Sequence, residues 1–504
     1  MVISSPVGYA WHGALRHGRL GALSHHILSV IAHHVVSPAV RASFISPYQV
    51  PEYTAVATFG VVVGVVGIVA SRRWADPTRA ARHSRWWAAV TWYRHPPVLV
   101  TAAVLGMAAT TVWIVHSMLV SPRGFVDLSV YRLGVQAWWQ RADVYGVLPA
   151  TGVGMVLPFT YPPFALLILG PLALPPWQWS IGGITVLSIA CLALVIYITI
   201  RKGWPAGGIR GAVVGTAVLL PLSLLTEPVA DTIWFGQVNL LLMALVALDC
   251  LAVSPRWPRG VLIGIAAAVK LTPAVFLLFF LLRKDYRALV TMAISGIVAT
   301  AIGFIADWSG SFTFWLGSSG GAHAVGDSAV VLNQSLAGGI ARLGMSGHAQ
   351  TALWLTLVAV LLVFAVAGIR KALLAGSVPL AMVITAGFGL MASPISWGHH
   401  WVYVVPATIL LVAEGIAHRR RGWLIVAAAV AVVFHVAAFL DVGTTWPPLS
   451  LLAENSFVLT SVALLAGYAG PNVWRAAARV ARRVPVPVHV PAAEQPTPVT
   501  SDAG

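Results

Sequence analysis

Residues 177–202 read WQWSIGGITVLSIACLALVIYITIRK and give the clearest indication of the fold. It carries no charge from Trp177 to Ile200, and Arg201 and Lys202 then end it. An α-helix rises about 1.5 Å per residue, so a run of this length crosses a hydrocarbon core of about 30 Å. Backbone groups inside lipid find no water and must bond to one another within a helix. We therefore predict a transmembrane helix whose basic end faces the cytoplasm.

Comparable apolar runs recur on both sides of this stretch. Of the 504 residues, 58% are hydrophobic and only 9% are charged, whereas a soluble protein carries roughly 25% charged residues. Because this charge cannot cover a soluble surface, we predict an all-α polytopic membrane protein with about 11–13 transmembrane helices. The other candidate spans are residues 54–70, 97–120, 209–226, 238–253, 286–306, 349–369, 378–391, 402–417, 423–440 and 457–470.

The net charge of +16 could suggest a nucleic-acid partner, but the basic residues lie between the apolar runs and form no single stripe. We interpret them as topology signals, which place basic loops in the cytoplasm of a cell-membrane protein. The basic clusters lie at residues 72–95, 201–202, 256–259, 283–287, 370–371, 419–421 and 475–483. The segments predicted to face outward are then 121–161, 227–239, 307–348, 393–401 and 441–455.

Two apolar segments are predicted to turn back within the membrane. Arg259 and Arg283 flank one run, yet both should be cytoplasmic, which predicts a re-entrant hairpin with Lys270-Leu271-Thr272-Pro273 at its tip. Residues 164–174, bracketed by prolines, are predicted to dip into the membrane and return. Irregular backbone at this depth is tolerated only where protein or an aqueous cavity covers it.

The organisation predicted along the chain has four parts. Residues 1–53 are an N-terminal extension, and residues 54–96 hold an extra transmembrane helix and a basic cytoplasmic loop. Residues 97–470 form the main membrane domain, and residues 471–504 form a basic and then Pro-rich cytoplasmic tail. We expect the Pro-rich part after Arg483 to be disordered. Cys191 and Cys250 both lie in apolar runs, so we infer no disulfide framework and no metal site.

Asp127 is the first candidate for chemistry, because it stands in the outward segment GFVDLSVY in an apolar setting that favours its protonated form. If the segment is helical, Tyr131 shares a face with Asp127. Capping of an interfacial helix is the alternative role for this aspartate. The same outward segment ends in PFTYPP, where Tyr161 is either a site residue or an interfacial anchor.

Lys270 and a histidine pair supply the candidate positive charges. A cation within an apolar segment is costly unless it is paired or hydrated, which makes Lys270 a functional candidate, with snorkelling to the interface as its alternative. His399 and His400 stand in SPISWGHHW. Adjacent side chains on a helix point in different directions, so we do not expect them to chelate a metal together. They could donate hydrogen bonds to an anionic group, or be ordinary interfacial histidines.

Neutral amides occur in two outward segments. Gln237 and Asn239 lie in the sequence GQVN, and Asn333 and Gln334 lie in NQS. These side chains could hydrogen-bond the hydroxyl groups of a sugar, or cap helices.

Six motifs in this order resemble those of glycosyltransferase family 87, the actinobacterial mannosyltransferases that depend on polyprenol-phosphate-mannose and have the GT-C membrane fold. The resemblance covers about residues 97–470. The motifs are DLSVY at 127–131, FTYPP at 159–163, GQVN at 236–239, KLTP at 270–273, NQS at 333–335 and SPISWGHH at 393–400.

The resemblance implies roles for the candidate residues. Asp127 corresponds to the general base of the family, and His399 or His400 to a histidine pair near the donor phosphate. Lys270 and Tyr161 match positions that line the cavity. The implied reaction moves mannose from a polyprenyl phosphate to a mannosylated lipid or lipoglycan on the extracytoplasmic side, with α-1,2 linkage and inversion, and without metal or cofactor.

Two alternatives remain open on the sequence. A donor carrying a pentose on polyprenyl phosphate fits the same chemistry. A transporter or lipid flippase would also combine about a dozen spans with broken helices and an intramembrane lysine. A transporter should place its polar groups along a path near the midplane, whereas here they gather at the outer boundary.

Overall fold

The computed structural model describes residues 96–119, 123–317, 328–417, 421–436 and 447–481. Predictions about the first 95 residues, including the span at 54–70, and about the Pro-rich end of the tail lie outside this part of the chain. Within it all regular elements are helices, and one isolated β-bridge joins Asn333 to Trp397. The prediction of an all-α fold is confirmed.

The helices follow one another with short connections. They are α5 (Pro96–Leu119), α6 (Val126–Trp139), α7 (Phe164–Ala173), α8 (Trp177–Gly203), η4 (Pro205–Gly207), α9 (Gly208–Ser223), α10 (Glu227–Phe235), α11 (Asn239–Leu251), α12 (Val261–Val269), η5 (Thr272–Val275), α13 (Phe276–Arg283), α14 (Tyr286–Ala306), α15 (Trp308–Leu316), α16 (Leu336–Arg342), α17 (Gly347–Leu374), α18 (Val378–Ala392), η7 (Gly398–Tyr403), α19 (Val404–Ala417), α20 (Arg421–Val436), α21 (Pro447–Glu454) and α22 (Ser456–Ala481).

Five helical stretches are long and apolar enough to cross a membrane, and α10 and α11 add a sixth if the pair, bent by 118°, is one span. The five are 177–203, 205–223, 286–306, 347–374 and 398–416. Of six shorter apolar helices of 10–17 residues, four fall on other predicted spans and two on the segments predicted to turn back. The chain is therefore a multi-pass membrane protein, while the total number of crossings and their orientation stay predictions.

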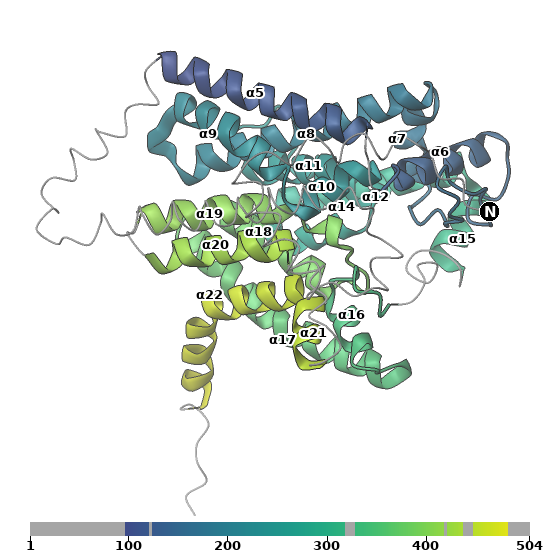
Figure 1. Ribbon diagram of the computed structural model, residues 1–504. Coiled ribbons are helices and arrows are strands. Elements are labelled where there is room, and N and C mark those ends of the chain that lie inside the picture. Colours follow the sequence, from purple (N-terminus) through teal and green to yellow (C-terminus); the bar gives the residue numbers. More distant parts are fainter. Residues whose placement is uncertain (1–95, 120–122, 318–327, 418–420, 437–446, 482–504) are drawn as a thin grey trace, which may run out of the picture.

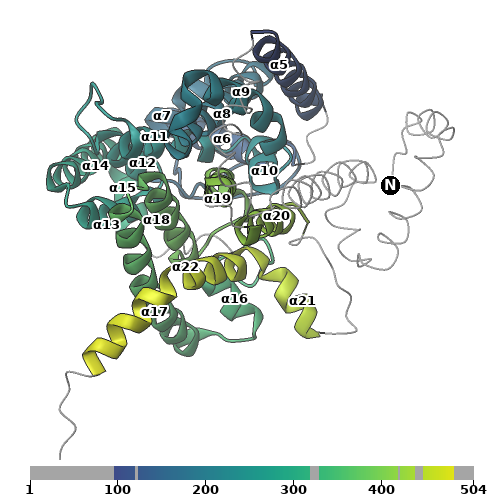
Figure 2. The same ribbon diagram turned by 90° about the vertical axis from the view of Figure 1, so that its left-hand side faces the viewer.

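The long helices lie side by side in a bundle. Figure 1 shows α5, α9 and α19 running across the view, with α6 and α15 both toward its right-hand end. In Figure 2, turned by 90°, α5 to α9 lie on one side, α12 to α15 on a second, and α17 and α22 on a third. Helix α22 runs on to Ala481. The tail predicted to begin at residue 471 thus begins as a helix.

The hairpin predicted around Lys270 is present. Arg259 Nε at the start of the first limb lies 3.9 Å from Asp285 Oδ2 beyond the second. Arg283, which ends α13, donates a hydrogen bond to the carbonyl of Cys250 at the end of α11. Both limbs therefore begin and end on one side, which leaves Lys270, between α12 and η5, at the far tip.

The apolar core has two parts. One lies among α8, α11, α13, α17, α18, α19 and α22, and the other joins α6 and α7 to the loop before α7. Two segments turn back within the bundle, one at residues 236–238 and one at Lys270. Both turns lie beside the histidine segment η7, between the two parts of the apolar core. Polar side chains on these turns are thus covered by protein, as irregular backbone within a membrane requires.

Candidate active site

Asp127 is placed by an unusual start to α6. Gly124 and Phe125 both have left-handed backbone angles, with φ of 59° and 50°. The amide of Phe125 donates to the carbonyl of Trp234 on α10, at 2.9 Å. Phe125 is the N-cap residue and Asp127 lies in the first turn, so Asp127 is not the cap of this helix. Its carboxylate is half-buried and turns toward α10 and the residues that follow it.

Gln237 holds the carboxylate of Asp127. Its Nε2 donates to Asp127 Oδ2 at 2.8 Å, while its Oε1 accepts from the hydroxyl of Tyr131 at 2.6 Å. The Tyr161 hydroxyl lies 2.9 Å from the Tyr131 hydroxyl and also contacts Gln237. The prediction that Asp127 and Tyr131 share a face of α6 is confirmed, because both meet the same amide.

A glycine allows this close approach. Helix α10 ends at Gly236, which has a φ of 71°. A Cβ atom at this position would lie 2.7 Å from Leu128 Cβ on α6. Any side chain here would therefore push the first turn of α6 away from Gln237.

Burial raises the pKa of the Asp127 carboxyl to about 6. The Gln237 hydrogen bond and the charge of Lys270 lower this pKa, and the charge of Asp231 raises it. The carboxyl is then mostly ionised at neutral pH, yet more basic than an exposed aspartate. A group with a pKa near the working pH is suited to general base catalysis.

Lys270 faces this base from the tip of the hairpin. It is the extended residue that ends α12, and its Nζ lies 3.0 Å from Asn239 Oδ1 and 3.1 Å from His400 Nε2. It also lies over the ring of Tyr161, 5.5 Å from the ring centre. Lys270 is thus turned into the protein, and snorkelling does not describe it.

The two histidines have different surroundings. Their rings are almost perpendicular, at 84°, with centres 4.7 Å apart. His400 is half-buried beside Lys270. His399 is buried and packs on the ring of Phe235, with ring centres 4.9 Å apart. His400 is therefore the member of the pair that an anion beside Lys270 would meet.

The backbone of the histidine segment is fixed from the turn that follows α10. The carbonyl of His399 accepts from Asn239 Nδ2 at 2.9 Å and from Thr232 Oγ1 at 2.8 Å. Asn239 thus binds both Lys270 and the histidine segment, two residues after Gln237 binds Asp127. The sequence GQVN joins the base to the cations.

Asn333 and Gln334 do not join this cluster. Both side chains are completely buried. Asn333 accepts from the amide of Ser396 and donates to the carbonyl of Pro394, while Gln334 bonds backbone groups near residues 331, 454 and 457. These amides hold the strand-like segment before the histidines, which leaves no group free for a sugar. We propose this structural role in place of the predicted substrate contact.

An ion pair next to Asp127 was not singled out by the sequence analysis. Arg123 Nε and Nη2 lie 3.2 and 3.3 Å from the two carboxylate oxygens of Asp231. Glu227, one turn earlier on α10, is also buried, and neither of its carboxylate oxygens has a hydrogen-bond partner among the described residues. The sequence shows that the outward segment 227–239 contains two carboxylates, but it does not indicate that Arg123 binds one of them.

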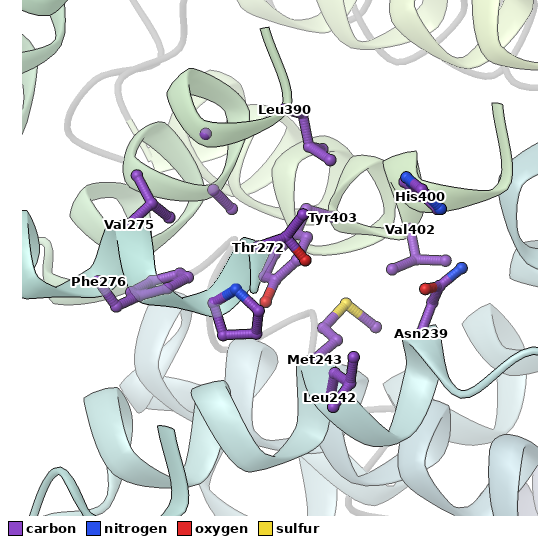
Figure 3. A pocket seen from close by; sticks show the side chains of 13 residues that line it. Asn239, Leu242, Met243, Thr272, Val275, Phe276, Leu390, His400, Val402 and Tyr403 are labelled. Carbon is purple, nitrogen blue, oxygen red and sulfur yellow. The ribbon is translucent and has the colours of Figure 1, made fainter. Parts of the chain in front are cut away.

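A small cavity of about 40 Å³ adjoins the cation side of the cluster. Figure 3 shows Asn239 and His400 at one end, with Leu242, Met243 and Phe276 along its wall. The rest of the lining is largely apolar and comes from η5, α18 and η7. Within the described residues, no three metal-binding side chains come together.

The site therefore has two layers. Asp127, Lys270 and His400 are half-buried and can be reached, whereas Gln237, Asn239, Tyr131 and Tyr161 are buried behind them. The four buried groups had been predicted as substrate contacts. In the structure Gln237 and Asn239 bind Asp127 and Lys270 directly, whereas the hydroxyls of Tyr131 and Tyr161 bind Gln237. Such a site can accept a proton at a carboxylate and bind an anion at a lysine and a histidine.

Comparisons with known proteins point in the same direction. Residues 159–394 match the sequence profile of glycosyltransferase family 87. The chain is 34% identical, over 66% of its length and 78% of the relative, to a polyprenol-phosphate-mannose-dependent alpha-(1-2)-phosphatidylinositol mannoside mannosyltransferase of Mycobacterium tuberculosis. It is 31% identical, over 66% of its length and 80% of the relative, to the corresponding pentamannoside mannosyltransferase of Mycolicibacterium smegmatis.

A more distant relative is an alpha-(1->3)-arabinofuranosyltransferase of Corynebacterium glutamicum, 27% identical over 29% of this chain and 34% of that protein. No solved structure matches the chain significantly. The extent of the similarity to the mannosyltransferases, together with the profile match, shows that this chain belongs to glycosyltransferase family 87.

Proposed function

We propose that the protein transfers mannose from polyprenyl-phosphate-mannose to a hydroxyl of a mannosylated phosphatidylinositol lipid, on the extracytoplasmic side of the cell membrane. The observation that carries this proposal is the turn at residues 236–239. Gln237 holds the base Asp127 on one side, and Asn239 holds Lys270 and the histidine segment on the other. A base and an anion site thus stand on opposite sides of one short rigid segment, as transfer from a phosphate to a hydroxyl requires.

The proposed chemistry follows from these positions. Asp127 takes the proton of the acceptor hydroxyl while the oxygen of that hydroxyl attacks the anomeric carbon of mannose. The bond between that carbon and the phosphate oxygen breaks, and the polyprenyl phosphate leaves with one more negative charge than it had in the donor. Lys270 and His400 stabilise this charge. A single displacement inverts the anomeric carbon, so a β-linked donor gives an α-linked product, which in the mycobacterial relatives is a 1,2 linkage.

One reachable carboxylate suits this reaction. Asp231 is bound by Arg123, and Glu227 is buried, so within the described residues neither of these neighbouring carboxylates can act with Asp127 from the open side. Hydrolases that cleave glycosides use two carboxylates that flank the bond. This difference supports transfer to an acceptor hydroxyl and not hydrolysis.

The test compares donors with purified protein in lipid nanodiscs and EDTA present throughout. Polyprenyl-phosphate-mannose, GDP-mannose and polyprenyl-phosphate-arabinose are each offered with a mannosylated phosphatidylinositol acceptor. We expect turnover with the first donor alone, and loss of that turnover in Asp127→Asn, which keeps the size of the side chain and removes the base. Turnover only with GDP-mannose, or only after a divalent metal is added, would refute the proposal, and turnover with the arabinose donor would move it to a pentose.

A further inference from the structure

The ion pair between Arg123 and Asp231 is almost closed to solvent. The two side chains are 9% and 4% exposed, and both carboxylate oxygens meet the guanidinium group. An exposed ion pair contributes little to stability, but removal of one partner from a buried pair is strongly destabilising, because it leaves a buried charge without compensation. This pair is therefore a strong constraint on whatever it joins.

The ion pair joins the segment before α6, the helix that carries Asp127, to helix α10, which lies next to the histidines. Arg123 directly precedes the two left-handed residues that start α6. Its guanidinium also lies over the ring of Phe235, 5.5 Å from the ring centre. The same ring packs against His399. On the same helix as Asp231, Thr232 binds the carbonyl of His399. Helix α10 thus touches the base segment on one side and the histidine segment on the other.

We propose that the Arg123–Asp231 ion pair is a positioning device that holds the base-bearing start of α6 in register with the histidine segment η7. The proposal rests on the proposed function, because it assumes that Asp127 is the base. Neither residue of the pair acts on substrate directly, since both side chains are closed to solvent and bound to each other. They act through the place and the surroundings of Asp127.

The pair also sets the charge that Asp127 meets. The charged or titratable groups that face Asp127 are Asp231 from α10, Lys270 from the hairpin, Tyr131 from α6 and Tyr161 from the loop before α7. The charge of Asp231 raises the pKa of Asp127. Arg123 compensates that charge, so loss of one partner should have the opposite electrostatic effect from loss of the other.

The experiment uses Arg123→Met, Asp231→Leu and the double variant, in full-length protein in nanodiscs, with Arg259→Met as the control. Arg259 is a partly buried arginine that also has a carboxylate neighbour and lies at the base of the hairpin, at the opposite end from Lys270. The readouts are the pH dependence of kcat/KM and amide hydrogen exchange of residues 125–130. The exchange measurement needs no activity, so it keeps its meaning if the substrate assignment fails.

We expect each single variant to lower kcat/KM at least tenfold and to speed exchange at residues 125–130. The acid limb of the pH profile is the fall in activity at low pH. We expect its midpoint to rise by roughly half a pH unit or more in Arg123→Met and to fall by a similar amount in Asp231→Leu. The double variant, which removes both members of the pair, should recover slow exchange and part of the activity. Arg259→Met should leave both readouts at wild-type values.

Simple loosening of the fold gives a different result. Water that enters a loosened site would lower the pKa of Asp127 in both single variants, so limbs that move in the same direction would overturn the proposal. Unchanged exchange at residues 125–130 in both single variants would overturn it as well. Should Arg123→Met not insert, Arg123→Lys keeps the charge without the two-pronged contact and should show a smaller change in the same direction. Altered exchange in a protein that transfers no mannose would support positioning and refute the proposed function.

Discussion

Replacement of Gln237 by methionine should move the pH dependence of the reaction without removing the base. Methionine is similar to glutamine in length and volume but cannot donate a hydrogen bond. In Gln237→Met, Asp127 loses the 2.8 Å contact from Nε2, while Lys270 and Asp231 keep their places beside it. The variant also removes the contacts of Gln237 with Tyr131 and Tyr161, but it leaves the charges of the site unchanged.

The size of the effect follows from the kind of bond. A hydrogen bond to a charged group contributes about 1.5–3 kcal/mol, and one pKa unit corresponds to about 1.4 kcal/mol. Since the bond stabilises the carboxylate form, its loss should raise the pKa of Asp127 from about 6 by roughly one to two units. The base works as a carboxylate, so activity is lost as the pH falls through this pKa, and a raised pKa moves that loss to higher pH.

At pH 7 the ionised fraction of Asp127 should fall from about nine tenths to between roughly one half and one tenth. We expect kcat/KM at this pH to fall by about two- to tenfold, with most of the loss regained by pH 8.5. The assay is initial-rate mannose transfer in nanodiscs between pH 5 and 8.5. Its acid limb reports the pKa of the base in the free enzyme.

A matched substitution guards against a general effect of losing a buried amide. Gln334→Met removes an equally buried glutamine whose bonds go to backbone groups and not to Asp127. It should destabilise the protein and leave the acid limb in place. If Gln237→Met keeps the wild-type limb, or if its activity stays low at every pH, then Gln237 does not act through the ionisation of Asp127 and the reasoning is wrong.

Three further predictions follow from the same site. Lys270→Met should lower kcat by about 10²–10³-fold in donor-saturated assays, because it removes charge stabilisation of the departing phosphate, and it should move the acid limb of Asp127 upward. Gly236→Ala should lower thermal stability by about 1–3 kcal/mol, since its φ is 71° and the new Cβ would meet α6 at 2.7 Å; an unchanged melting temperature would contradict the close packing. Ser129→Cys should react with a membrane-impermeant thiol reagent in intact cells and Ser254→Cys should not, and the reverse pattern would place the site in the cytoplasm.

Much of the fold could be predicted because lipid leaves few choices. Long uncharged runs such as 177–200 had to be helices, and they are helical in the structure. The hairpin at Lys270 was predictable from two arginines that could not lie on opposite sides of the membrane. The number of crossings was harder to predict, because apolar helices of 10–17 residues are compatible both with a tilted or broken span and with a segment that enters and returns.

The partners of polar side chains could not be predicted in the same way. Asp127 and Gln237 are separated by 110 residues, and Arg123 and Asp231 by 108. Gln237 and Gln334 stand in similar outward segments, yet one amide binds the base and the other binds backbone. A sequence gives the donors and acceptors that a segment carries, but the tertiary packing decides whether a neighbouring backbone group uses them first.

The division between reachable and buried groups also bears on the choice between an enzyme and a transporter. A transporter that alternates between two sides must let its polar groups exchange partners as the path opens and closes. Here Gln237 and Asn239 lie on one turn, and each binds side chains or backbone from separate elements with bonds of 2.6–3.0 Å. A movement of one element past another would break several of these buried bonds at once, each at a cost of about 1–3 kcal/mol. Fixed dipoles around a carboxylate and a lysine are costly for transport, but they are what stabilises developing charge during group transfer.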